Sequence, residues 1–349
     1  WVYQSGAQSF TFIDPNPYHK DTFCTELRIP IPYDPIFLRE WKDLIQALGL
    51  RYKSHPALTK VRISGINTSS AELILPHSSG KAIPNCDKTS NDIQNWINAG
   101  YTATLIKNTW LDIANAFQAA FPDKALSDAF SPNGLPKIND FGQYDAKLRL
   151  NEDILNLGRA SLGPFFIPQN NGLSARWEYG MVRNAAADGT VGFQMLWFVT
   201  GDGTYRMNGK VPGNPQTIFE EAVIRGINAG GSYLEIYKQD IANPDFQEIL
   251  KGGNEKIWEV PRIFHLQVSN LTSDSATIRW NTYEASDSMV EYGRDTRYEF
   301  QTPLDSSLVI SHSVQLSGLS PSTPYHYRAR SEDVLGNVGY SYDFTFITP

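Results

Sequence analysis

Two glutamates stand where strands are expected to end, and they could act as the acid and base of a hydrolysis. Glu72 follows the stretch ISGINTSSA, in which an apolar strand runs into Gly, Asn and small hydroxyl residues. Glu235 lies in the β-rich stretch SYLEIYKQD. Cleaving a glycosidic bond needs two carboxyl groups, one to protonate the leaving oxygen and one to attack carbon or activate water. These two residues therefore form the best candidate catalytic pair.

Amide and aromatic side chains accompany the glutamates at the ends of the expected strands. The predicted substrate-binding residues are Asn67, Asn170, Gln194, Trp197 and Tyr237. Amides offer donors and acceptors together, as sugar hydroxyls require, and flat rings can face the apolar C–H patches of a pyranose. Each of these residues could instead have a purely structural role. Glu72 could cap a helix or pair with an arginine, Glu235 could be a buried partnered glutamate, and the amides and Trp197 could serve the core.

The elements before about Pro261 alternate between helical and strand-like stretches, which predicts a parallel sheet. Helices are expected within 35–50, 93–120, 152–160, 215–229 and 245–251, and strands at 61–66, 125–130, 163–167, 191–199 and 232–237, with a weaker signal at 9–13. No Gly-rich phosphate loop follows a strand, which argues against a nucleotide-binding sheet. A (β/α)8 barrel is expected. Such barrels normally take about 250 residues. Because only five strand–helix units are counted here, the first strands of the barrel are expected to lie upstream of Trp1.

Residues 1–250 resemble a clan-A-type glycoside hydrolase barrel, distantly like families 42 and 5. IPIPYDPIFLREWKDLIQALGLRY resembles the segment before the fourth strand, VRISGINTSSAEL the fourth strand, and GSYLEIYKQDI a late strand. The resemblance implies that Glu72 is the acid/base and Glu235 the nucleophile or base. The chain departs from the clan at two positions. Ala71 stands where Asn is usual, and Gln194 lies on the strand where the clan carries its nucleophile.

Short β-rich segments recur after Pro261, and some seven strands in about ninety residues predict a β-sandwich. Strands are expected at 264–268, 276–280, 288–292, 309–316, 325–330 and 340–347. LSPSTPY resembles the fibronectin type III turn that leads into a tyrosine corner, and SATIRW places Trp280 where that family keeps its core Trp. SMVEYG resembles the version of the module found beside phosphatases and other secreted hydrolases. The resemblance covers nearly all of 261–349.

The predicted architecture is therefore α/β plus all-β, with a barrel over 1–258 and a fibronectin type III-like sandwich over 259–349. The formal net charge is −7 and no basic stripe occurs, so nucleic acid is not an expected partner. No run of 18 apolar residues occurs, so no membrane span is expected. Cys24 and Cys86 could form a disulfide or remain two buried thiols. The chain starts at Trp1 rather than Met, which indicates that its natural start is missing.

The leading functional hypothesis is an extracellular or cell-surface glycoside hydrolase that acts on an oligo- or polysaccharide without cofactor or metal. His19 has no Cys or His at ligand spacing, which argues against a metal site. The alternative is a catalytically inactive glycan-binding or structural, adhesive surface protein that forms a homo-oligomer or a surface assembly. A phosphatase, suggested by the companion sandwich, is the weakest hypothesis, because the sequence shows no His/Asp metal cluster.

Overall fold

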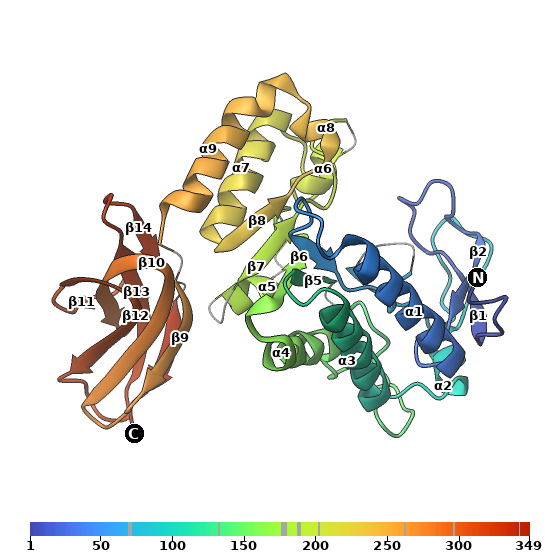
Figure 1. Cartoon of the computed structure of the whole chain (residues 1–349), viewed down its shortest axis with the longest axis horizontal. Coiled ribbons are helices and arrows are strands. Elements are labelled where there is room, and N and C mark those ends of the chain that lie inside the picture. Colours follow the sequence, from blue (N-terminus) through green and yellow to red (C-terminus); the bar gives the residue numbers. More distant parts are fainter. Residues whose placement is uncertain are drawn as a thin grey trace. The chain divides into compact units, whose positions relative to one another are not determined.

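The structure is a computed structural model of the chain (Figure 1). It describes residues 1–68, 72–131, 133–175, 180–186, 190–201, 203–261, 263–295, 297–341 and 343–349. The chain divides into two compact units, Trp1–Asn170 and Asn171–Pro349, and each is described by itself. The predicted boundary between 258 and 259 stays a prediction. No helix in the described ranges is long and apolar enough to cross a membrane.

The first unit contains parallel strands and three longer helices. Its elements are β1 (Ser9–Ile13), β2 (Glu26–Pro30), α1 (Pro35–Tyr52), β3 (Lys60–Arg62), β4 (Glu72–Leu73), α2 (Asp92–Asn98), α3 (Ala103–Ala120), β5 (Ala125–Phe130), α4 (Leu150–Leu162), η1 (Gly163–Phe165) and β6 (Phe166–Asn170). β5 is the central strand, because β3, β4 and β6 all pair with it in parallel. Helix α3 packs against both α1 and α4. The parallel strands agree with the predicted β/α alternation.

Local capping explains where the helices of this unit begin and end. The Asp34 carboxylate accepts the backbone N–H groups of Ile36 and Phe37, both at 3.0 Å, and Pro35 takes the first helical position of α1. The single helix expected over 93–120 is two helices instead. Gly100 lies between α2 and α3 with a φ of +79°. A left-handed glycine ends a helix, which is why the apolar periodicity continues while the helix does not.

The N-terminal strand signal belongs to a small separate sheet rather than to a barrel. β1 pairs antiparallel with β2 in a two-stranded sheet. A disulfide between Cys24 and Cys86, with Cα atoms 5.5 Å apart, ties the β1–β2 connection to the loop before α2. This settles the alternative left open by the sequence. The bridge spans 62 residues of sequence, and a closed loop of that length stabilises the folded state by roughly 4 kcal/mol in the chain-entropy account.

The second unit begins with a parallel strand pair and its helices. The elements are α5 (Gly180–Ala185), β7 (Val191–Gln194), α6 (Gly203–Met207), α7 (Pro215–Asn228), β8 (Gly231–Glu235), α8 (Lys238–Ile241), η4 (Pro244–Phe246) and α9 (Gln247–Glu259). β7 and β8 are parallel, with Gln194 opposite Glu235. The strand expected over 191–199 ends at Gln194. The backbone N–H of Val199 donates to both carboxylate oxygens of buried Asp240 at 3.2 Å, so this residue lies in a loop held by a side chain.

The C-terminal β-sandwich contains β9 (Ile263–Ser269), β10 (Ser275–Gly293), β11 (Phe300–Gln301), β12 (Asp305–Ser317), β13 (Pro324–Glu332), β14 (Val338–Tyr340) and β15 (Phe344–Ile347). The two strands expected at 276–280 and 288–292 are one strand, β10. Its first part pairs with β9 and β12, and its last part pairs with β11 and β13. Register shifts between Asn281 and Ser288 mark the passage from one sheet to the other.

The sandwich core confirms the fibronectin type III-like expectation. Trp280 lies in the core with Ile278, Val290 and Tyr327. The Tyr325 hydroxyl accepts the backbone N–H of Ser320 at 2.9 Å, which is the hydrogen bond of a tyrosine corner. Both features were predicted from LSPSTPY and SATIRW. The coarse fold class, an α/β region with a fibronectin type III-like sandwich, is therefore the architecture of the chain.

Candidate functional site

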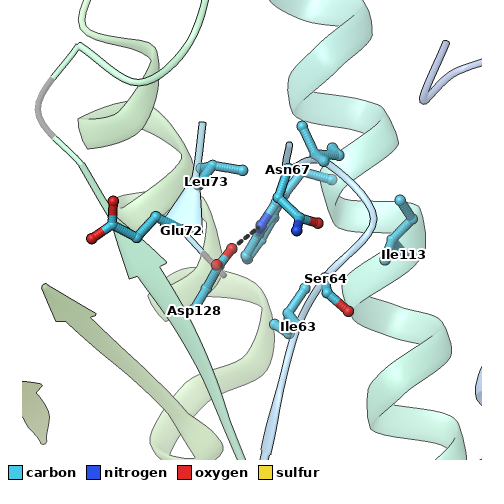
Figure 2. Close-up of a pocket in the computed structure, with 9 residues that line it drawn as sticks. Ile63, Ser64, Asn67, Glu72, Leu73, Ile113 and Asp128 are labelled. Atoms are coloured by element: carbon cyan, nitrogen blue, oxygen red, sulfur yellow. Dashed lines mark hydrogen bonds between the residues drawn. The ribbon is translucent and has the colours of Figure 1, made fainter. Parts of the chain in front are cut away.

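A small pocket in the first unit lies at the carboxyl ends of β3 and β4 and beside α3 (Figure 2). Its lining residues are Ile63, Ser64, Ile66, Asn67, Glu72, Leu73, Trp110, Ile113 and Asp128. The pocket encloses about 10 Å³, which is room for water rather than for a sugar ring or a phosphate ester. The predicted residues Glu72 and Asn67 both line it, so part of the candidate site is brought together here.

Asp128 on β5 is a buried acid with a raised pKa in this pocket, and it was not predicted from the sequence. One carboxylate oxygen accepts the indole N–H of Trp110 at 2.6 Å, and the other accepts the backbone N–H of Ala129 at 2.7 Å. Burial raises the pKa of Asp128 to about 7, although both donors and the charge of Arg62 act in the opposite direction. The only signal in the sequence is an acid within the apolar strand ALSDAF. A carboxyl group of this kind can exchange a proton near neutral pH.

Glu72 opens β4 and is half-buried, opposite Ala129 of β5. Figure 2 shows its carboxylate on the side of β4 away from Asn67. Glu72 thus lines the pocket, but its carboxylate does not point toward Asn67, which was predicted to bind the same substrate.

Asn67 has a structural task in the turn after β3. Its side-chain oxygen accepts the backbone N–H of Gly65 at 3.0 Å, and its amide donates to the Thr68 carbonyl at 3.3 Å. Gly65 has a φ of +126°, and a Cβ there would lie 2.6 Å from the Trp41 indole nitrogen. That indole donates to the Ser64 carbonyl at 2.7 Å. The Asn67 side chain and the Trp41 indole therefore hold the turn that leads toward the pocket.

The remaining predicted binding residues lie on other strand ends. Asn170 is the last residue of β6 and is fully buried. In the second unit the Gln194 amide donates to the Asn171 side-chain oxygen at 2.7 Å. Glu235, the register neighbour of Gln194, is exposed at the end of β8, so the alternative interpretation of Glu235 as a buried glutamate is wrong.

The predicted aromatic residues of the second unit form a cluster. The rings of Trp197 and Tyr237 lie 6.1 Å apart at 48°, and Phe198 lies 5.5 Å from Trp197. The guanidinium carbon of Arg206 stands 4.3 Å from the centre of the Trp197 ring. An arginine over the tryptophan face is a stabilising cation–π contact.

Glu72 belongs to the first unit and Glu235 to the second. The geometry within each unit does not test whether they act together, so their pairing stays a prediction, as does the binding role of the five amide and aromatic residues.

Metal-ligating side chains come together at one place in the described ranges, at Cys24, Cys86 and Asp87. The two cysteine sulfurs are bonded to each other, so they are not thiolates. This group therefore does not fit a metal ion.

Comparison with known proteins identifies the sandwich. Residues 261–348, about a quarter of the chain, match the N-terminal domain of purple acid phosphatase. No curated protein matches the chain. Among solved structures, the sixth fibronectin type III domain of human fibronectin type III domain containing protein 3 is 22% identical at a TM-score of 0.21, with 24% of this chain and 80% of that one covered. A structure of PhoD is 17% identical at a TM-score of 0.20, covering 24% of this chain and 18% of that one.

The family match corrects the functional hypotheses. Residues 261–348 match the N-terminal domain of purple acid phosphatase rather than a part of a glycoside hydrolase, so the prediction of a glycoside hydrolase, and with it a glycosidase or carbohydrate-binding activity, is wrong. The resemblance to a glycoside hydrolase barrel is corrected with it. It rested on three short segments, two of which carry a glutamate at a strand end, and parallel α/β folds place carboxylates there in many unrelated proteins.

Proposed function

We propose that this chain is part of a phosphoesterase-type protein in which the sandwich accompanies the catalytic centre and does not itself carry it. The observation behind the proposal is the match of residues 261–348 to the N-terminal domain of purple acid phosphatase. The sandwich interior supports a structural role, because Trp280, Tyr325 and Tyr327 are buried in its core.

An extracellular or cell-surface location is part of the proposal. The Cys24–Cys86 disulfide supports it, because such bonds persist in oxidising compartments.

The finer fold of the α/β region is proposed as a (β/α)8 barrel. In support, β5 and β6 are parallel neighbours in the first unit, and β7 and β8 are in the second, each pair joined through helical segments.

Phosphatases often use two metal ions to hold the attacking and leaving oxygens. The residues described in this chain do not offer such a centre, since their one group of ligand types contains a disulfide. No metal-dependent step is therefore assigned to them.

The test is an assay of the full protein, as isolated from its source, on aryl phosphate monoesters and diesters beside matched aryl glycosides. Hydrolysis of a phosphate ester without hydrolysis of the glycosides is expected. Loss of that activity on chelation, and its return with added metal, would identify the metal class. A protein that cleaves no phosphate ester, with or without added divalent metals, would overturn the proposal.

A further inference from the structure

The outer edge of β12 has features that suit a protein contact. In the sheet that contains β9, β10 and β12, the long strand β10 pairs with both of the others. Among the residues that the structure describes, β12 pairs with β10 alone. An edge strand presents a row of backbone N–H and C=O groups that another strand can bind.

After its first residue, Asp305, β12 lacks the charges that usually protect such an edge. Residues 306–317 contain no Asp, Glu, Lys or Arg, and no Pro. Leu308, Val309 and Ile310 follow one another and are 46%, 37% and 57% exposed. Natural edge strands are commonly guarded by lysine, proline or a bulge. Register shifts disturb the pairing near Ser286, but from Ser311 to Ser317 the ladder is regular.

We propose that this edge pairs with the same edge of a second copy of the chain, antiparallel and around a two-fold axis. In such a contact identical segments run past each other. The absence of charge in 306–317 removes the like-charge repulsion that would oppose it. With the two-fold axis at Ser313, the two Ser313 residues would face each other, and Val309 and Ile310 of each copy would lie opposite Ser317 and Leu316 of the other. The three strands β9, β10 and β12 of each copy would then join in one continuous sheet.

The charge-free edge also argues for this occupant over a different protein strand. A different protein is commonly selected through complementary charges, and residues 306–317 contain no charged side chain that could select one. Pairing of two copies requires only that the side chains of the two identical segments fit against each other.

The test is sedimentation equilibrium of the full chain over a range of concentrations. The wild-type protein should form dimers. Ser313→Lys puts a charge at an exposed position of β12, where each copy would face the other's lysine, and should weaken dimerisation by at least roughly tenfold. Thr345→Lys is the matched control, because Thr345 is exposed on β15 of the other sheet, and it should leave the dimer unchanged.

A second measurement locates the contact directly. Both cysteines of the chain are in the disulfide, so Ser311→Cys or Ser313→Cys supplies a single free thiol. One of these variants should form a cross-linked dimer under mild oxidation. Circular dichroism checks the fold, and Ser311→Lys replaces Ser313→Lys if the latter unfolds. A monomeric wild-type protein at its highest soluble concentration, or a dimer that the β12 lysines leave intact, would overturn the proposal.

Discussion

Asp128 shows at the scale of a residue how a buried acid couples folding to pH. Its folded pKa of about 7 lies above the ordinary value of 3.8, so the folded state holds its proton more tightly. Its contribution to stability is complete below pH 4 and is lost as the pH rises through 7. The difference between the two values corresponds to roughly 4 kcal/mol.

Asp128→Asn should remove this dependence. The free energy of unfolding of the wild type, relative to that of the variant, should fall between pH 4 and pH 7 and then level off. Urea unfolding followed by tryptophan fluorescence measures it, and groups that titrate in both proteins cancel in the difference. Parallel pH profiles for the two proteins would show that Asp128 ionises as an ordinary acid.

His312 in the sandwich has the opposite dependence. Its ring nitrogens lie 2.9 Å from the Thr282 hydroxyl and 2.8 Å from the Ser288 hydroxyl, and the ring stacks on Trp280 at 4.8 Å. Burial lowers the pKa of His312 to about 4, against a weaker opposing effect of Asp305. Stability from the neutral ring is therefore present above pH 6.5 and is lost as the pH falls through about 4, by roughly 3 kcal/mol.

The state of this ring can be measured by NMR. The imidazole signals of His312, assigned by their absence in His312→Gln, should report a neutral ring at pH 5. The variant should be less stable than the wild type at pH 7, because it loses the stacking and a hydrogen bond, and should lose stability less steeply below pH 6.5. A ring that titrates near pH 6.5 in the folded protein would contradict this account.

Gly65, in the turn after β3, shows how strongly the stability of an element can depend on one position. Gly65 combines a left-handed backbone with a close approach to the Trp41 indole, 2.6 Å from where a Cβ would stand. Gly65→Ala should therefore destabilise the first unit by about 1–3 kcal/mol. Gly100→Ala is the control, because Gly100 is also left-handed but has no atom within 4 Å of the added carbon. Chemical unfolding should show a larger loss for Gly65→Ala, and equal losses would contradict the steric explanation.

At the scale of the whole molecule, the elements were more predictable than the chemistry. The strand Ala125–Phe130 was predicted with the bounds that it has, because it is a short run closed by turn residues. The helix expected over 93–120 is broken at Gly100, since periodicity does not report a local change of backbone. The raised pKa of Asp128 comes from its burial in the folded unit, and neither that burial nor its contact with Trp110, 18 residues away, can be read from the sequence. The disulfide joins residues 62 apart and was for the same reason left open.

The prediction of a glycoside hydrolase failed for a different physical reason. Side-chain types at strand ends describe what a site could do, but they do not show that a pocket of the right size exists. The pocket beside Glu72 encloses about 10 Å³. The sandwich, by contrast, was predictable because Trp280 and the turn before Tyr325 are determined by its own short-range packing.

The passage of β10 through both sheets has a mechanical consequence. The 19-residue strand β10 contributes to both sheets, so local unfolding of one sheet must also disturb the pairing in the other. Neither sheet can therefore unfold independently. Amide protons on both halves of Ser275–Gly293 should therefore exchange with solvent at a common slow rate, as parts of one cooperative opening event.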